Sequence, residues 1–175
     1  HTDGLPWWLF DMRPQGYLGR AYAQRHGHLL GLPARLTDWS DTHALRALLA
    51  HGHDMVGNVL LGELARDHFV NAPTPQACAP ADYPRLAAQA ISADATWSSA
   101  GGEQPKFCAQ SATGHVLVKF TAAEVSPIST RWRDLLVAEH LALETLHGAG
   151  IAAARSRLLD VGTQRFLALE RFDRV

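Results

Sequence analysis

The sequence has few cysteines, no long apolar run and almost no net charge. Cys78 and Cys108 stand alone among 175 residues, and without paired spacings they indicate neither a disulfide framework nor a zinc knuckle. No stretch approaches the roughly 18 apolar residues of a membrane-spanning helix, and no signal peptide is recognisable. A formal net charge of −1 without a Lys/Arg cluster argues against a nucleic-acid-binding surface. These absences predict a globular, cytoplasmic protein with reduced thiols and no membrane contact.

The first 70 residues predict a small module with a β-rich start. An apolar, aromatic run at residues 5–10, followed by a proline-containing turn, is typical of a β-hairpin. Ser40 or Asp41 can cap a helix whose leucines recur at spacings of three and four, and Gly52 can end it. The apolar alternation of residues 55–61 then indicates a strand.

Prolines mark the boundary between two expected domains. Four of them lie between residues 71 and 84, among small and polar residues that do not hold a regular element. We therefore expect an N-terminal module at residues 1–75, a linker at residues 76–90 and a second domain at residues 91–175.

The second domain is expected to combine an antiparallel sheet with one long helix. The sequence predicts a glycine-rich turn at residues 98–106, a strand at residues 116–120, a helix from about residue 130 to 147, and a hairpin that turns near Gly162. The expected fold class of the whole chain is α+β, with a small N-terminal β-rich module ahead of this sheet and helix.

Lys119 is the sharpest chemical signal in the chain. Of 16 Lys+Arg residues only Lys106 and Lys119 are lysines, and Lys119 ends the short β-type run HVLVKF. Leu117 and Lys119 share one face of that strand, where a compact ammonium can act as a point charge for phosphate oxygens. The alternative is a strand-end lysine whose charged head lies in water.

Glu139 provides a partner for this lysine. In the predicted helix the apolar positions Trp132, Leu136, Leu143 and Leu146 place Glu139 in the same stripe. A carboxylate on an inward-facing stripe needs a cation or several donors, because an unpaired desolvated charge is costly. We therefore expect Glu139 to pair with Lys119, as in protein kinases. The alternative is a carboxylate at the edge of the stripe that reaches solvent.

The glycine-rich turn SSAGGEQPK at residues 98–106 precedes the lysine strand. Small residues let backbone N–H groups approach an anion, as in phosphate-binding turns. The turn is neither GxGxxG nor GxxxxGK[ST], and Pro105 removes one donor. A flexible hairpin turn would look much the same.

Taken in order, these segments resemble the HipA kinase family, the toxins of toxin–antitoxin pairs. The resemblance rests on the SxxGxxQPK turn, the VLVKF strand, the AEHLALETLHGAGI helix and the closing LALERFDR. Upstream, THALRALLAHGHDMVGNVLLGE resembles the end of that family's N-terminal subdomain. The resemblance spans most of the chain and implies a protein-kinase-like N-lobe at residues 91–175. Its most specific piece is ERFDR at residues 170–174, the family's hinge.

The resemblance also implies roles for single residues in binding ATP. Lys119 would contact the phosphates and Glu139 would orient it, whereas Glu170 and Phe172 would meet the adenine through backbone groups.

The glycine-rich turn is implied to have two roles of its own. Gly101, Gly102 and Gln104 would lie at the ATP phosphates, and Ser99 aligns with the family's autophosphorylated serine, with Ser98 adjacent. A phosphate added there would place like charge beside ATP and oppose nucleotide binding.

The chain departs from the family pattern in two respects. The catalytic Asp, its companion Asn and the metal-binding Asp follow the hinge in the family, so we expect them downstream of Val175 and assign no catalytic residue or metal ligand in this chain. Mg²⁺ is thus implied as a cofactor beside ATP, with its ligands elsewhere. Glu103 is an acid inside the expected phosphate turn. Since the chain begins at His1, we expect a fragment, and a DNA-binding segment ahead of it stays open.

Ten histidines are many for this length. The pairs His26/His28 and His51/His53 resemble metal-binding spacings, but zinc sites need three or four ligands, and no Cys or carboxylate cluster accompanies either pair. We therefore expect no metal site in this chain.

The residues together favour an ATP-dependent serine/threonine protein kinase of HipA type, represented by its N-terminal subdomain and N-lobe. The implied partners are a protein substrate and an antitoxin. The rival interpretation is a catalytically inert HipA-like module that contacts an antitoxin or another regulator. A downstream catalytic Asp and metal-binding Asp would distinguish the two. No residue in the sequence identifies the substrate.

Overall fold

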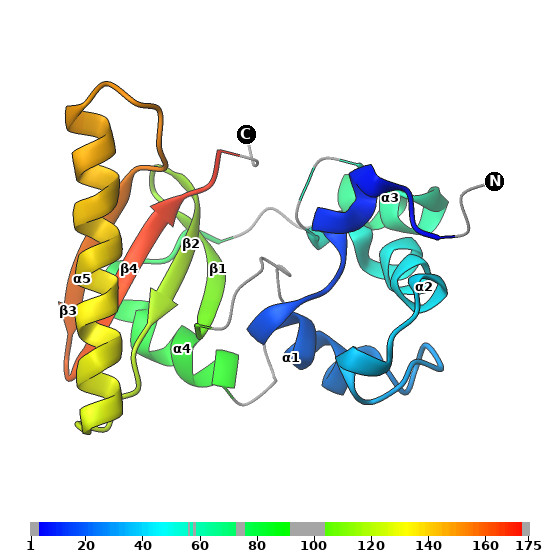
Figure 1. Ribbon diagram of the computed structural model, residues 1–175, viewed down its shortest axis with the longest axis horizontal. Helices are drawn as coiled ribbons and strands as arrows, with labels where there is room; N and C mark the ends of the chain where they lie inside the picture. Colours follow the sequence, from blue (N-terminus) through cyan, green and yellow to red (C-terminus); the bar gives the residue numbers. More distant parts are fainter. Residues whose placement is uncertain (1–3, 56, 58, 73–75, 92–103, 173–175) are drawn as a thin grey trace. The chain divides into compact units, whose positions relative to one another are not determined.

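The computed structural model describes residues 4–55, 57, 59–72, 76–91 and 104–172. They fall into two compact units (Figure 1), the first within residues 4–72 and the second comprising residues 76–91 and 104–172. The first is helical and the second contains a four-stranded antiparallel sheet with helices. The expected α+β class is confirmed.

The described part of the first unit is built from helices. Its α-helices are α1 (Gly16–His26), α2 (Asp41–His51) and α3 (Gly62–Val70), joined with the 3-10 turns η1 (Trp7–Met12), η2 (Leu36–Asp38) and η3 (Gly52–Asp54). Helix α2 begins where the sequence predicts it, because Ser40 caps its first turn and Gly52 follows its last residue.

The expected β-rich start of this unit is wrong. The apolar positions that become buried are Leu5, Leu9 and Met12, whose spacing of three and four is helical rather than alternating. Trp7 is 79% exposed, so the aromatic run does not form the buried face of a strand. No strand occurs among the described residues between 4 and 72, including the expected strand around residue 59.

The stretch expected to be a linker is folded. Residues 76–90 contain the 3-10 turn η4 (Pro80–Asp82) and most of α4 (Tyr83–Ile91). Their prolines occupy first-turn positions, where the missing N–H breaks no helical hydrogen bond. The buried residues Tyr83, Ala87 and Ala90 form the inner side of α4, which packs on the sheet.

The sheet has the order β1-β2-β4-β3 with all neighbours antiparallel. Its strands are β1 (Lys106–Ser111), β2 (Gly114–Phe120), β3 (Ser156–Val161) and β4 (Gln164–Glu170), and α5 (Pro127–Gly148) connects the two hairpins. The lysine strand, the long helix and the hairpin at Gly162 are therefore where the sequence predicts them. Gly162 has a φ of +60°, which suits its place in this tight turn.

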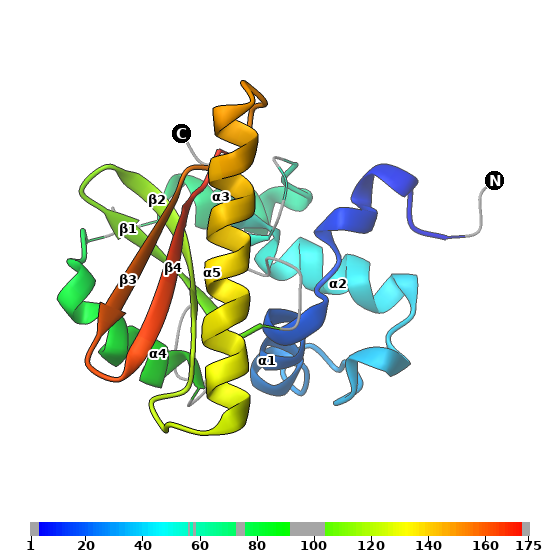
Figure 2. The ribbon, with the colours of Figure 1, turned by 60° about the vertical axis from the view of Figure 1, so that its left-hand side comes forward.

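The two faces of the sheet carry different helices. Helix α5 lies along one face (Figure 2), where Leu136 packs with Leu167 and Leu169. On the opposite face, the Tyr83 ring of α4 contacts Phe107 and Phe166 at centroid distances of 5.7 and 5.6 Å. Alternate residues of each strand point to opposite faces of the sheet. We call the face that α5 covers the α5 face and the other the α4 face.

Candidate functional site

Lys119 and Glu139 form an ion pair on the α5 face of the sheet. The Lys119 Nζ donates to Glu139 Oε1 at 2.5 Å and to Oε2 at 2.8 Å. The side chains of Lys119 and Glu139 are 19% and 33% exposed, so the pair is partly shielded from water. The contact is the one expected from the sequence, whereas the role of either residue in binding ATP stays a prediction.

Local packing explains why the two side chains meet. Lys119 follows Leu117 by two residues on β2, and both face α5, whereas Val116 and Val118 point to the α4 face and are buried. On α5, Glu139 lies three residues after the fully buried Leu136. That spacing keeps Glu139 on the side of the helix that faces the sheet.

One position of the predicted helical stripe differs in the structure. Leu143 is partly buried against the core under α5, but Leu146 is 38% exposed. His140 and His147 lie nearer the sheet, where their ring nitrogens hydrogen-bond to Ser156 Oγ at 2.8 Å and to the Ala153 carbonyl at 2.7 Å. The side of α5 that faces the sheet therefore includes His140 and His147, whereas Leu146, which the sequence pattern placed there, is exposed.

Sequence reasoning did not assign a role to Lys106. It lies directly opposite Lys119 in the β1–β2 register and is buried, with 1% of its surface exposed. Directly opposed residues share a face with Cβ atoms about 5 Å apart, so the two lysines of the chain stand side by side on the α5 face. Their rarity in an arginine-rich chain was the signal that could have identified both.

The glycine-rich turn is described only at its end. Ser98, Ser99, Gly101, Gly102 and Glu103 lie outside the described residues, so their expected roles stay predictions. Gln104 is described, and its Nε2 is buried without a hydrogen-bond partner among the described residues. Because Gln104 precedes Lys106 by two residues, a buried donor without an acceptor lies close to the two lysines.

The expected hinge residues end the last strand. Glu170 is exposed, and its backbone N–H donates to the Arg155 carbonyl at 2.9 Å. Of its two backbone groups, the carbonyl is therefore the one that could contact a ligand. Phe172 is 87% exposed, and among the described residues its N–H has no hydrogen-bond partner. Arg171, between them, donates its N–H to the His115 carbonyl at 3.0 Å, which ties the strand end to β2.

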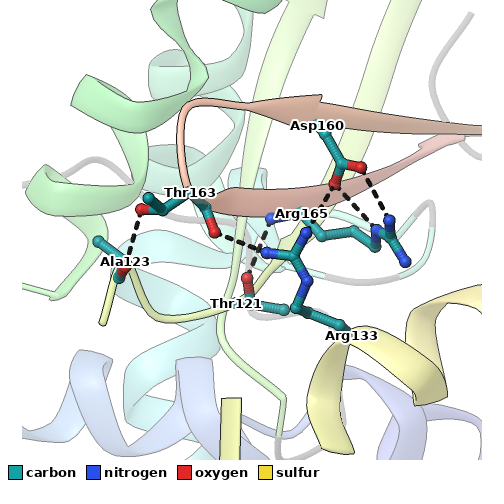
Figure 3. Close-up of polar contacts among 6 residues, drawn as sticks. All are labelled: Thr121, Ala123, Arg133, Asp160, Thr163 and Arg165. Atoms are coloured by element: carbon teal, nitrogen blue, oxygen red, sulfur yellow. Dashed lines mark hydrogen bonds and ion pairs between the residues drawn. The ribbon is translucent and has the colours of Figure 1, made fainter. Parts of the chain in front are cut away.

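A polar network ties the start of α5 to the β3–β4 hairpin (Figure 3). Arg165 donates to both carboxylate oxygens of Asp160, at 2.9 and 2.8 Å, and Arg133 of α5 donates to the Thr163 carbonyl at 2.6 Å and approaches Asp160 at 3.5 Å. The hydrogen bond from Arg165 holds the pKa of Asp160 below its ordinary value. Because α5 carries Glu139, this network helps to determine where Glu139 stands relative to Lys119.

The structure brings together histidines that are far apart in sequence. The ring of His51 lies 4.5 Å from His26 and 6.3 Å from His68, and His53 lies 5.0 Å from His68. Burial, then the neighbouring His51, lowers the pKa of His26 to about 4. The Tyr22 hydroxyl hydrogen-bonds to His51 Nδ1 at 2.7 Å. Among the described residues no group of three or more His, Cys, Asp or Glu side chains is arranged to hold a metal ion.

No helix in the described part of the chain is long and apolar enough to cross a bilayer.

Two family models match the chain, one in each unit. The model described as YjjJ-like toxin, middle domain, matches residues 1–70, and the model of the HipA-like C-terminal domain matches residues 98–175. Toxin YjjJ of Escherichia coli (strain K12) is 41% identical over 181 aligned residues, which cover 98% of this chain and 41% of that protein. The chain therefore spans about two fifths of the length of this curated relative. No solved structure matches it. The resemblance expected from the sequence is confirmed.

Proposed function

We propose that this chain, which is related to HipA-type toxins in both of its units, contains the nucleotide-binding part of an ATP-dependent serine/threonine protein kinase. The observation that carries the proposal is the bidentate contact of Lys119 with Glu139 on the α5 face of the sheet. Protein kinases hold a strand lysine against a helix glutamate in this way to place the ammonium at the nucleotide phosphates.

The charges at this site favour an anionic ligand. Lys119 brings an ammonium to the α5 face, and its contact with Glu139 fixes the orientation of that ammonium. A partly accessible ammonium with a fixed orientation attracts phosphate oxygens at low conformational cost. The buried Gln104 amide adds a donor for which the described part of the chain provides no acceptor.

The end of β4 fits an adenine ring that is bound through the backbone. The Glu170 carbonyl and the Phe172 N–H can serve as one acceptor and one donor, since the Glu170 N–H is used by Arg155. ATP would supply the γ-phosphoryl group, while Lys119 orients the phosphates and Glu139 keeps Lys119 in place. The catalytic Asp and the ligands of Mg²⁺ are expected after Val175, so this chain is proposed to bind and orient ATP.

The partners follow from the same relatives. A toxin of this kind implies a cognate antitoxin, and a kinase implies a protein substrate whose identity no residue here indicates. Ser99, with Ser98 adjacent, is the proposed autophosphorylation site. A phosphate there would bring two negative charges next to the ATP phosphates and lower the affinity for nucleotide.

The proposal is tested by intact-mass analysis of the full-length protein after incubation with Mg-ATP. We expect the wild type to gain phosphate, Lys119→Ala to gain none, and Ser99→Ala to lose the loop phosphate or carry it on Ser98. Arg131→Ala serves as the control, because Arg131 lies exposed on α5 and should leave phosphorylation unchanged.

Calorimetry with ATP separates binding from chemistry. If the wild type neither gains phosphate nor binds ATP, the kinase proposal fails and the inert binding module is favoured. Nucleotide binding that persists unchanged in Lys119→Ala would contradict the role given to this residue.

A further inference from the structure

A cavity of about 480 Å³ opens on the α4 face of the sheet, away from the lysine pair. Val116, Ala168 and Glu170 line it, whereas their strand neighbours Leu117 and Leu169 face α5. Volumes of 300–1,000 Å³ are typical of small-molecule sites. The cavity lies within the second unit, on the face of the sheet opposite Lys119, and shares only Glu170 with the residues proposed to bind ATP.

The cavity exists because the side chains on this face become smaller beyond α4. Near the helix, Phe107 and Phe166 fill the space against the Tyr83 ring. Further along the same face, the smaller Val116 and Ala168 stand in place of aromatic residues and line the cavity, with 5% and 8% of their surface exposed. The floor is therefore apolar, and the Tyr83 ring forms one wall of it.

Two arginines at the start of β3, Arg155 just before the strand and Arg157 within it, stand at the rim. Arg155 and Arg157 line the cavity and, being two residues apart on an extended segment, project to the same side with a separation of roughly 7 Å. Arg157 is close enough to Tyr83 to oppose the burial that raises the pKa of the Tyr83 hydroxyl. Among the described lining residues Glu170 is the one acid, against two arginines, so these residues carry an excess of positive charge.

Neither arginine is neutralised within the described residues. In that part of the chain, the side chains of Arg155 and Arg157 make no ion pair and no hydrogen bond. By contrast, Arg133 and Arg165 of the same unit both contact Asp160. Guanidinium groups bind carboxylates and phosphates in a bidentate manner, so the rim presents two unused anion-binding groups above an apolar floor.

We propose that this cavity binds a small organic anion, with its carboxylate or phosphate head on Arg155 and Arg157 and a flat apolar body on the floor formed by Tyr83, Val116 and Ala168. The ring of such a ligand would stack or pack against Tyr83 and remove apolar surface from water. The proposal does not depend on kinase activity.

The test is a titration of the isotope-labelled chain followed by two-dimensional NMR, with three probes that share one ring system: naphthoate, naphthyl phosphate and the neutral naphthamide. We expect the two anions to shift the backbone signals of Val116, Ala168 and neighbouring rim residues saturably, and naphthamide to bind at least tenfold more weakly. The tighter of the two anions identifies the preferred head group.

Variants of the rim then decide whether the arginines are responsible. The double variant Arg155→Gln/Arg157→Gln should weaken binding of the preferred anion at least tenfold, while Arg131→Gln on the exposed side of α5 should not change it. Both arginines are exposed, so the double variant is expected to keep the wild-type NMR spectrum elsewhere.

Four results would overturn the proposal. Equal affinity for naphthamide and naphthoate would remove the role of the arginines, as would unchanged binding in the double variant. Signals that shift only outside the cavity would remove the site. A response to an acidic peptide but to neither naphthyl anion would make the occupant a protein partner instead.

Discussion

At the scale of single residues, the Lys119–Glu139 pair is suited to orient a ligand more than to stabilise the fold. Both side chains are partly exposed, and ion pairs in such positions contribute about 0–1 kcal/mol to the free energy of unfolding. The geometry is nevertheless specific, because both Glu139 oxygens accept from one ammonium. Changing this pair should therefore affect nucleotide binding before it affects stability.

Glu139→Gln should weaken ATP binding by the full-length protein about tenfold, since an amide holds the ammonium in place less strongly than a carboxylate. The melting temperature should fall by only a few degrees. Calorimetric titration and thermal unfolding measure the two effects. Glu144→Gln, an exposed change on the same helix, is the control. A large loss of stability with unchanged ATP affinity would contradict this assignment.

His26 should make the first unit sensitive to mild acid. Its pKa in the folded chain is about 4, below the ordinary 6.5, because His26 is partly buried and His51, Arg25 and His28 are close to it. The unfolded chain therefore binds the proton more readily between these two values. The contribution of neutral His26 to the free energy of unfolding is therefore complete above about pH 6.5 and is lost as the pH falls toward 4.

We expect His26→Gln to reduce this loss by roughly 1–2 kcal/mol, after allowance for solvent screening. Urea unfolding at several pH values between 4 and 7, compared between variant and wild type, measures it. The same change at the exposed His28 should have a much smaller effect. An equal pH dependence of wild type and His26→Gln would refute the prediction.

At the scale of elements, helix α5 depends on its first turns for its placement. Ser126 caps the helix by accepting from the Ser129 N–H at 3.1 Å, with Pro127 as the first helical residue. Arg133 then joins the helix to the β3–β4 hairpin. These contacts lie at the opposite end of the helix from Leu146, which is exposed.

Asp160→Asn should loosen this junction and lower the free energy of unfolding by about 1 kcal/mol, because Arg165 loses its bidentate partner. The hydrogen bond from Arg165 lowers the pKa of Asp160 below 3.8, so the stabilisation is complete above that value and is lost as the pH falls further. Urea unfolding at pH 7 and pH 2.5 tests this.

The difference between the variant and the wild type should therefore be larger at pH 7 than at pH 2.5. Glu124→Gln, an exposed change ahead of the same helix, is the matched control. A difference that persists unchanged at pH 2.5 would mean that the Asp160 charge is not its cause.

At the scale of the whole molecule, each unit has a hydrophobic core of its own. Leu48, Trp39 and Tyr22 belong to the core of the first unit, whereas Leu136 and Leu167 belong to the core of the second. The residues of each of these cores come from one unit.

Leu48→Ala and Leu136→Ala should each cost about 2–5 kcal/mol, because both side chains are fully buried and leave a cavity. Amide hydrogen exchange should show the loss of protection mainly in the unit that carries the change. An equal loss throughout both units in either variant would mean that the chain unfolds as one cooperative body.

The sequence by itself determined the elements whose signals are local. The alternation around Lys119 specifies the pleat of β2, the stripe around Leu136 specifies the inner side of α5, and Ser40 specifies the start of α2. The strand alternation and the helical stripe together predict the Lys119–Glu139 contact. They place the lysine and the carboxylate on facing sides of β2 and α5, where each charge needs the other as a partner.

Only the tertiary structure decided the features that depend on which surfaces become covered. An aromatic run with Trp7 at its start is compatible with a strand or a turn of helix, and the burial of Leu9 and Met12 selects the helix. Prolines that suggest a linker instead begin η4 and α4. The side-by-side lysines, the histidine cluster and the cavity beyond Tyr83 arise from residues distant in sequence, because they depend on register and packing rather than on local periodicity.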